Sequence, residues 1–75
     1  MGEMPPKVRE LKARLRKAGF YSRPGKGSHT VWKHQDFPGA RLVLSGSDGD
    51  DAQYYQIEDV ESILVKLRAK LRKEY

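Results

Sequence analysis

The sequence predicts an α+β fold in the order α-β-β-β-α, in which two helices pack on one face of a three-stranded antiparallel sheet. Apolar residues recur at helical spacing near both ends of the chain, whereas the middle shows the alternation of strands, interrupted by turns that contain glycine and proline. One sheet face buried under two helices is a minimal two-layer arrangement for so short a chain. We therefore expect the 75 residues to form one domain, spanning 1–75.

The first helix is expected to begin just after Pro5 and Pro6, because proline is tolerated where a first-turn N–H would be unpaired anyway. Gly19 is suited to end it, since glycine readily adopts the left-handed conformation found just after helices. The apolar residues between these points, spaced by three, four and three positions, are Val8, Leu11, Leu15 and Ala18. This stripe is expected to face the core.

Three strands are expected next, at residues 21–23, 29–33 and 41–45. The first turn between them, residues 24–28, contains Gly25 and Gly27, and we expect both glycines to adopt positive φ. The second turn is expected to span residues 34–40, which include aspartate, proline and glycine. Trp32 alternates with its neighbours along the second strand and is expected to lie in the core.

An acidic loop and a second helix complete the predicted fold. Residues 45–53 hold three aspartates and two glycines and are predicted to form an exposed loop. Tyr54 and Tyr55 follow directly, and we expect at least one of them to pack against the sheet or a helix. The apolar stripe of the final helix is expected to consist of Ile57, Val60, Leu64, Leu67 and Leu71, with Ile63 beside it.

The net charge of +5 and the pI near 9.7 indicate an anionic partner. Nucleic acid is the leading class, and an acidic protein or an anionic membrane surface is the alternative. Most of the cations lie within residues 7–33, where Glu10 alone opposes them, and this asymmetry predicts one basic face. These cations are Lys7, Arg9, Lys12, Arg14, Arg16, Lys17, Arg23, Lys26 and Lys33.

The composition also excludes several classes of protein. The chain has no cysteine, so disulfides and thiolate metal sites are absent. No apolar run approaches the roughly 18 residues of a membrane span, and the first residues lack the apolar core of a signal peptide. We expect a soluble, cytoplasmic protein without a membrane partner.

The first turn carries the residues that are suited to chemistry. His29 is a candidate for proton transfer, because histidine titrates near neutral pH. Arg23 and Lys26 place positive charge near it, as a phosphate ligand requires. The backbone N–H groups of Gly27 and Ser28 can also face a phosphate. Taken alone, these residues are equally consistent with a turn histidine that only binds phosphate.

A second set of basic side chains lies along one flank of the first helix. Lys12 and Arg16 belong to this flank and are predicted to contact RNA phosphates. His34 is the only other histidine, and it falls on the strand face opposite to His29 if the strand continues that far. We therefore do not expect His34 to share the site.

The first half of the chain contains short motifs that are specific in combination. Residues 17–20 read Lys-Ala-Gly-Phe, and residues 27–32 read Gly-Ser-His-Thr-Val-Trp. Residues 7–11, which read Lys-Val-Arg-Glu-Leu, and Arg23 belong to the same pattern. In these residues the chain resembles the HicA family of toxin ribonucleases. The resemblance implies a double-stranded-RNA-binding-domain-like fold, cleavage of RNA, and neutralisation by a cognate HicB antitoxin. It also implies that the family's active-site histidine is His29.

Together with this resemblance, the sequence predicts the toxin of a type II toxin–antitoxin pair, an endoribonuclease that cleaves mRNA without a metal or other cofactor. RNA carries its own nucleophile, the 2′-hydroxyl, so cleavage requires in-line positioning, removal of a proton and stabilisation of charge at phosphorus. His29 is expected to move the proton. Two alternatives stay open, namely a non-catalytic RNA-binding module of the same fold and a protein-interaction module that docks an acidic partner.

Overall fold

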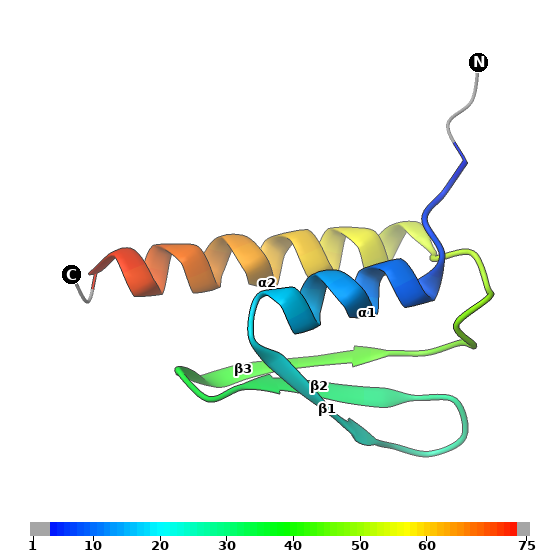
Figure 1. The fold of residues 1–75 in the computed structure, drawn as a ribbon, viewed down its shortest axis with the longest axis horizontal. Helices are drawn as coiled ribbons and strands as arrows, with labels where there is room; N and C mark the ends of the chain where they lie inside the picture. Colours follow the sequence, from blue (N-terminus) through cyan, green and yellow to red (C-terminus); the bar gives the residue numbers. More distant parts are fainter. Residues whose placement is uncertain (1–3, 74–75) are drawn as a thin grey trace.

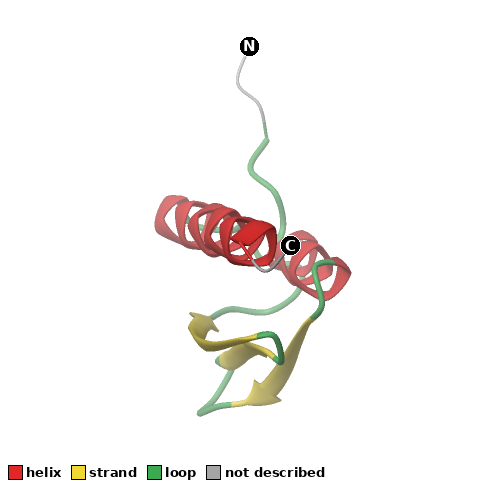
Figure 2. Cartoon of the chain, turned by 90° about the vertical axis from the view of Figure 1, so that its left-hand side faces the viewer, coloured by secondary structure: helices red, strands yellow, loops and turns green. Residues whose placement is uncertain are grey.

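The computed structural model describes residues 4–73 and confirms the predicted order of elements (Figure 1). Figure 2 shows that both helices lie on the same side of the sheet. No helix within the described residues combines the length and the apolar character that crossing a membrane requires. The elements are α1 (Val8–Lys17), β1 (Phe20–Pro24), β2 (Thr30–His34), β3 (Phe37–Leu44) and α2 (Tyr54–Lys73).

The sheet is an antiparallel meander in the order β1-β2-β3, with one side toward the helices. In β2, Trp32 and His34 are buried on the helix side. The alternate residues of each strand therefore form the opposite side, which we call the outer face of the sheet. No described helix or strand covers this face (Figure 2). The outer face carries Tyr21, Arg23, Val31, Lys33, Arg41 and Val43.

The core lies between the sheet and the helices, around Trp32, whose exposed fraction is 0%. The predicted stripe of α1 is buried from Val8 to Leu15, which confirms that face of the helix. The Trp32 indole N–H donates to Thr30 Oγ1 over 2.9 Å, so the one polar group of this side chain has a partner inside the protein. The predicted place of Trp32 in the core is confirmed.

The second turn is much shorter than predicted. It consists of Gln35 and Asp36, and β3 already begins at Phe37. Pro38 is accommodated within β3 because this strand lies at the edge of the sheet, where a missing N–H need not break a ladder. The aspartate, proline and glycine that suggested a long turn are therefore shared between a two-residue turn and an edge strand.

The predicted apolar stripe of α2 is confirmed in part: Val60, Ile63 and Leu67 are buried as predicted, and Gln56 joins them. Gln56 is buried although it is polar: its Nε2 donates to the Ser45 carbonyl over 2.9 Å, and its Oε1 accepts the Gln53 N–H over 2.9 Å. Both ends of this amide are bonded, as burial requires. The buried line is Gln56, Val60, Ile63 and Leu67. The predicted residues that are only half-buried are Ile57, Leu64 and Leu71.

The two tyrosines at the start of α2 are both exposed, by 83% for Tyr54 and 53% for Tyr55. The prediction that one of them packs against the sheet or a helix is wrong. Gln56 faces inward at this point, and the residues one and two positions before it lie roughly 100° and 200° around the helix. Neither direction leads into the core.

Candidate functional site

The turn between β1 and β2 holds His29 at its end. The Gly25 N–H donates to the His29 carbonyl over 2.8 Å, and the His29 N–H donates to the Lys26 carbonyl over 3.0 Å. Two residues on one side of the hairpin thus lie opposite a single residue on the other, as in a β-bulge. Gly27 has a φ of +59°, as predicted, at the first central position of a tight turn, where hairpins of type II′ favour glycine.

Gly25 serves a different purpose from the predicted one. Its φ is not positive, so the prediction of a left-handed conformation at this position is wrong. The space around it is restricted instead, since a Cβ on Gly25 would lie 3.3 Å from His29 Cβ and 3.2 Å from the His29 carbonyl oxygen. Glycine therefore leaves room for the histidine that lies across the hairpin from it.

His29 lies where the outer face of the sheet meets this turn. It directly precedes Thr30, which pairs with Leu44 on the helix side of the sheet. Alternation then places His29 on the outer face together with Arg23, and both residues are exposed. The structure thus brings the predicted catalytic residue and one predicted phosphate ligand to one face.

Several polar groups around this turn have no partner within residues 4–73. No hydrogen bond or ion pair there engages the His29 imidazole, the Arg23 guanidinium or the Lys26 ammonium. The N–H groups of Gly27 and Ser28 form no backbone bond there either. Ser28 Oγ accepts the Gly46 N–H over 3.2 Å, which holds the turn against the loop after β3. The remaining groups are open to an anionic ligand.

The sequence that builds this hairpin and its surroundings matches a known family. The family described as HicA toxin of bacterial toxin-antitoxin matches residues 8–64, from the start of α1 into α2. The chain belongs to the HicA toxin family. This HicA protein is accordingly the toxin of a toxin–antitoxin system, with a cognate antitoxin as its implied partner. The curated proteins and the solved structures gave no match to it.

The two remaining predicted phosphate ligands of the HicA protein belong to the helix layer. Lys12 Nζ forms an ion pair with Asp48 Oδ1 over 2.7 Å. The Arg16 guanidinium carbon lies 5.2 Å from the centroid of the Trp32 ring, which faces the helices. Neither side chain belongs to the outer face with His29. The prediction of one basic face is therefore wrong, because the cations are divided between the helix layer and the outer face of the sheet.

The acidic loop of the HicA protein, residues 45–53, caps the start of α1. The Val8 N–H donates to the Asp50 carbonyl over 2.9 Å. The Arg9 N–H donates to the Asp48 carbonyl over 3.2 Å. The first N–H groups of a helix have no acceptor within the helix, so the loop carbonyls supply the acceptors that α1 lacks. The aspartates are exposed, as predicted, but no local pattern in the sequence indicates that the loop docks on a helix 36 or more residues away.

Asp48→Asn is expected to lower the stability of the HicA protein near neutral pH and to flatten its decline in acid. The hydrogen bond from Lys12, and then the charge of Lys12, lowers the pKa of Asp48 below its ordinary value of 3.8. A lowered folded pKa means that the stabilisation is fully present above pH 3.8 and is lost as the pH falls through the lowered value. The effect is small and weakens with salt, because the carboxylate is exposed to solvent.

Urea midpoints of the wild type and Asp48→Asn, measured from about pH 2 to 7, check this expectation. Asp59→Asn is the matched control, because Asp59 is an exposed carboxylate on α2 with no ion pair within the described residues. If the urea midpoints of the two variants fell equally as the pH was lowered, this stabilisation could not be assigned to the Lys12–Asp48 pair.

The second histidine of the HicA protein, His34, lies on β2 and has a structural role, because its ring binds the end of α1. Its Nε2 donates to the Ala18 carbonyl over 2.9 Å, and its Nδ1 accepts the Asp36 N–H over 3.0 Å. These bonds assign the neutral tautomer with the proton on Nε2. A Cβ on Gly19, whose φ is +97°, would lie 2.8 Å from His34 Nε2, so glycine here both ends the helix and admits the ring. As predicted, His34 lies on the opposite face from His29.

Proposed function

We propose that this HicA protein is a metal-independent endoribonuclease that cleaves mRNA, with His29 as the group that transfers protons. The observation that carries the proposal is the exposed imidazole at the end of the uncovered outer face, beside the Gly27 turn and on the same face as Arg23. The chain has two histidines, and both ring nitrogens of His34 are bonded to the backbone. Within the described residues, His29 is the histidine that can accept a proton and return it.

The proposed reaction uses the nucleophile that RNA supplies. His29 removes the proton of a 2′-hydroxyl, the oxygen attacks the adjacent phosphorus, and the bond to the 5′-oxygen breaks. The leaving 5′-oxygen takes up a proton from the imidazolium or from water, and the other product ends in a 2′,3′-cyclic phosphate. Arg23, Lys26 and the N–H groups of Gly27 and Ser28 stabilise the charge that develops on the phosphate oxygens.

The outer face offers a path along which single-stranded RNA reaches His29. Tyr21 is 45% exposed and lies directly across the strands from Lys33. An aromatic ring beside a cation is typical of surfaces that hold single strands through base stacking and phosphate contacts. Arg23 is two residues along β1, a step of roughly 7 Å toward the turn. A base stacked on Tyr21 therefore leaves the backbone directed past Arg23 toward His29.

The partner and the place of action follow from the same proposal. We infer that the cognate antitoxin is HicB-like and that the toxin acts on mRNA in the cytoplasm. Lys12 and Arg16 stay predicted phosphate ligands, but they contact only RNA that extends from the outer face onto the helix layer. An RNA that binds there has to displace Asp48 from Lys12.

Incubation of the purified protein with a long single-stranded RNA in excess EDTA tests the proposal. We expect fragments with 2′,3′-cyclic phosphate ends and no cleavage of DNA of the same sequence, since DNA lacks the 2′-hydroxyl. Intact RNA that stays bound would instead indicate the non-catalytic RNA-binding module. Intact RNA that does not bind at physiological salt would favour the protein-interaction module.

Gly25→Ala is expected to slow cleavage several-fold, because the new methyl group would lie 3.3 Å from His29 Cβ and would displace the histidine by a few tenths of an ångström. The loss should stay below the roughly 100-fold that a misplacement of about 1 Å can cost. Gly39→Ala is the matched control, since no atom lies within 4 Å of a Cβ at that position. Single-turnover rates check the pair, and equal rates would show that the space beside His29 is not limiting.

A further inference from the structure

The second half of α2 extends beyond the helix that packs beside it. The helix α1 has 10 residues and α2 has 20. At 1.5 Å per residue their lengths are about 15 and 30 Å. Figure 1 shows the last turns of α2 continuing past the end of α1. Apolar residues on this part of α2 therefore lack a neighbouring helix to cover them.

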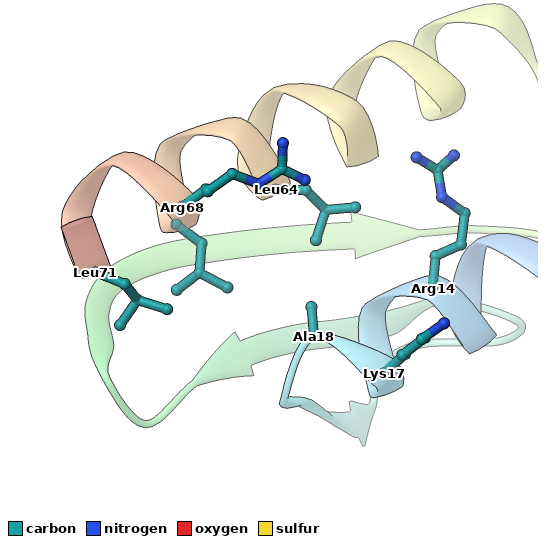
Figure 3. Close-up of a pocket in the computed structure, with 7 residues that line it drawn as sticks. Arg14, Lys17, Ala18, Leu64, Arg68 and Leu71 are labelled. Atoms are coloured by element: carbon teal, nitrogen blue, oxygen red, sulfur yellow. The ribbon is translucent and has the colours of Figure 1, made fainter.

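A groove of about 470 Å³ lies at this place, between the end of α1 and the second half of α2 (Figure 3). Its apolar part comes from Ala18 of α1 and from Leu64, Leu67 and Leu71 of α2. Leu64 and Leu71 are only half-buried. They are seven residues apart, the spacing at which a helix presents one seam to a partner helix.

The rim of the groove is positively charged. Arg14 and Lys17 of α1 and Arg68 of α2 contribute to its lining, and among residues 4–73 no carboxylate does. None of the three forms an ion pair within residues 4–73. The groove thus combines an apolar floor with unpaired cations, in the helix layer and away from the outer face that carries His29.

We propose that this groove binds an acidic amphipathic helix of the cognate antitoxin. Leucines at heptad spacing receive apolar side chains of a helix, and the three cations receive carboxylates on its flanks. RNA fits this floor less well, since it has no aliphatic groups to place against Leu64 and Leu71. The proposal rests on membership of the toxin family and not on the proposed ribonuclease activity. It gives the antitoxin an anchor that is separate from the outer face.

Leu71→Glu tests the floor of the groove, with Val65→Glu as the matched control. Leu71 lines the groove and is half-buried, whereas Val65 is 61% exposed on α2 and lies outside the groove lining. The probe is the purified cognate antitoxin, and its Kd is measured by titration calorimetry. We expect Leu71→Glu to weaken binding at least tenfold and Val65→Glu to change it less than twofold.

The double variant Arg14→Glu/Arg68→Glu tests the rim without touching the buried core. We expect at least a tenfold loss of antitoxin binding, with the circular-dichroism melting curve of the wild type. RNA cleavage by the variant without antitoxin should be unchanged, because neither residue belongs to the outer face. Wild-type antitoxin affinity in both Leu71→Glu and the double variant would overturn the proposal. A double variant that loses affinity for RNA while it keeps affinity for the antitoxin would overturn it as well.

Discussion

His29→Ala is expected to lower the rate of RNA cleavage by about 10²–10⁴-fold, the range associated with loss of a general acid or base. The imidazole is exposed and makes no hydrogen bond within the described residues, so the substitution removes little packing. The free energy of unfolding should therefore stay within about 0.5 kcal/mol of the wild type. Single-turnover cleavage of a labelled RNA and urea unfolding measure the two quantities on the same preparation.

His34→Ala is the matched control, with the opposite expected pattern. It leaves the Ala18 carbonyl and the Asp36 N–H without their partner, at a cost of about 1–3 kcal/mol for each group that stays buried and unpaired. The molecules that remain folded should cleave RNA at the wild-type rate. If His29→Ala instead lowered stability as much as His34→Ala and cleaved normally, His29 would be a structural residue and the proposed mechanism would fail.

Trp32→Ala is expected to cause a large loss of stability, which unfolds the protein if its stability lies at the lower end of the range for its size. The side chain is completely buried between the sheet and the helices, and truncation of a buried tryptophan to alanine costs about 3–5 kcal/mol. A domain of 75 residues has a total stability of about 4–11 kcal/mol, at roughly 0.05–0.15 kcal/mol per residue. The loss therefore consumes much or all of the stability. Urea unfolding followed by far-ultraviolet circular dichroism measures it.

Two milder variants separate the contributions of the indole. Trp32→Phe keeps an aromatic ring in the core and should cost less than Trp32→Ala. Thr30→Val removes the acceptor of the indole N–H, which leaves a buried donor unpaired and should cost about 1–3 kcal/mol. A wild-type urea midpoint for Trp32→Ala would contradict the central place of this residue in the core.

The features that the sequence predicted correctly are those set by local spacing. The stripe from Val8 to Leu15 follows the helical repeat, and Trp32 follows the alternation of β2, so each residue's face could be assigned without its partners. The order of elements follows from the same two periods. The Gly27 turn was also predictable, because a tight hairpin needs a residue that tolerates positive φ.

The features that the sequence did not predict depend on contacts between distant residues. Two lines of residues on α2 have helical spacing, one through Ile63 and one through Leu64. Packing against the shorter α1 decides that the line through Ile63 is the buried one. Gln56 reads as a surface residue until the carbonyl of Ser45 is placed beside it. In the candidate site, the spacing of basic residues on α1 could not reveal that Lys12 already forms an ion pair with Asp48.

The cap on α1 has a consequence for the order in which the molecule can be assembled. The loop that caps α1 comes 36 to 44 positions later in the chain than the lysines to which its aspartates bind. The same loop holds the hairpin through the bond between Gly46 and Ser28. A nascent chain that has emerged only as far as β3 therefore lacks the loop contacts that cap its first helix and that tie the turn before His29 to the rest of the fold. These two sets of contacts form together, late in synthesis, by one non-local closure.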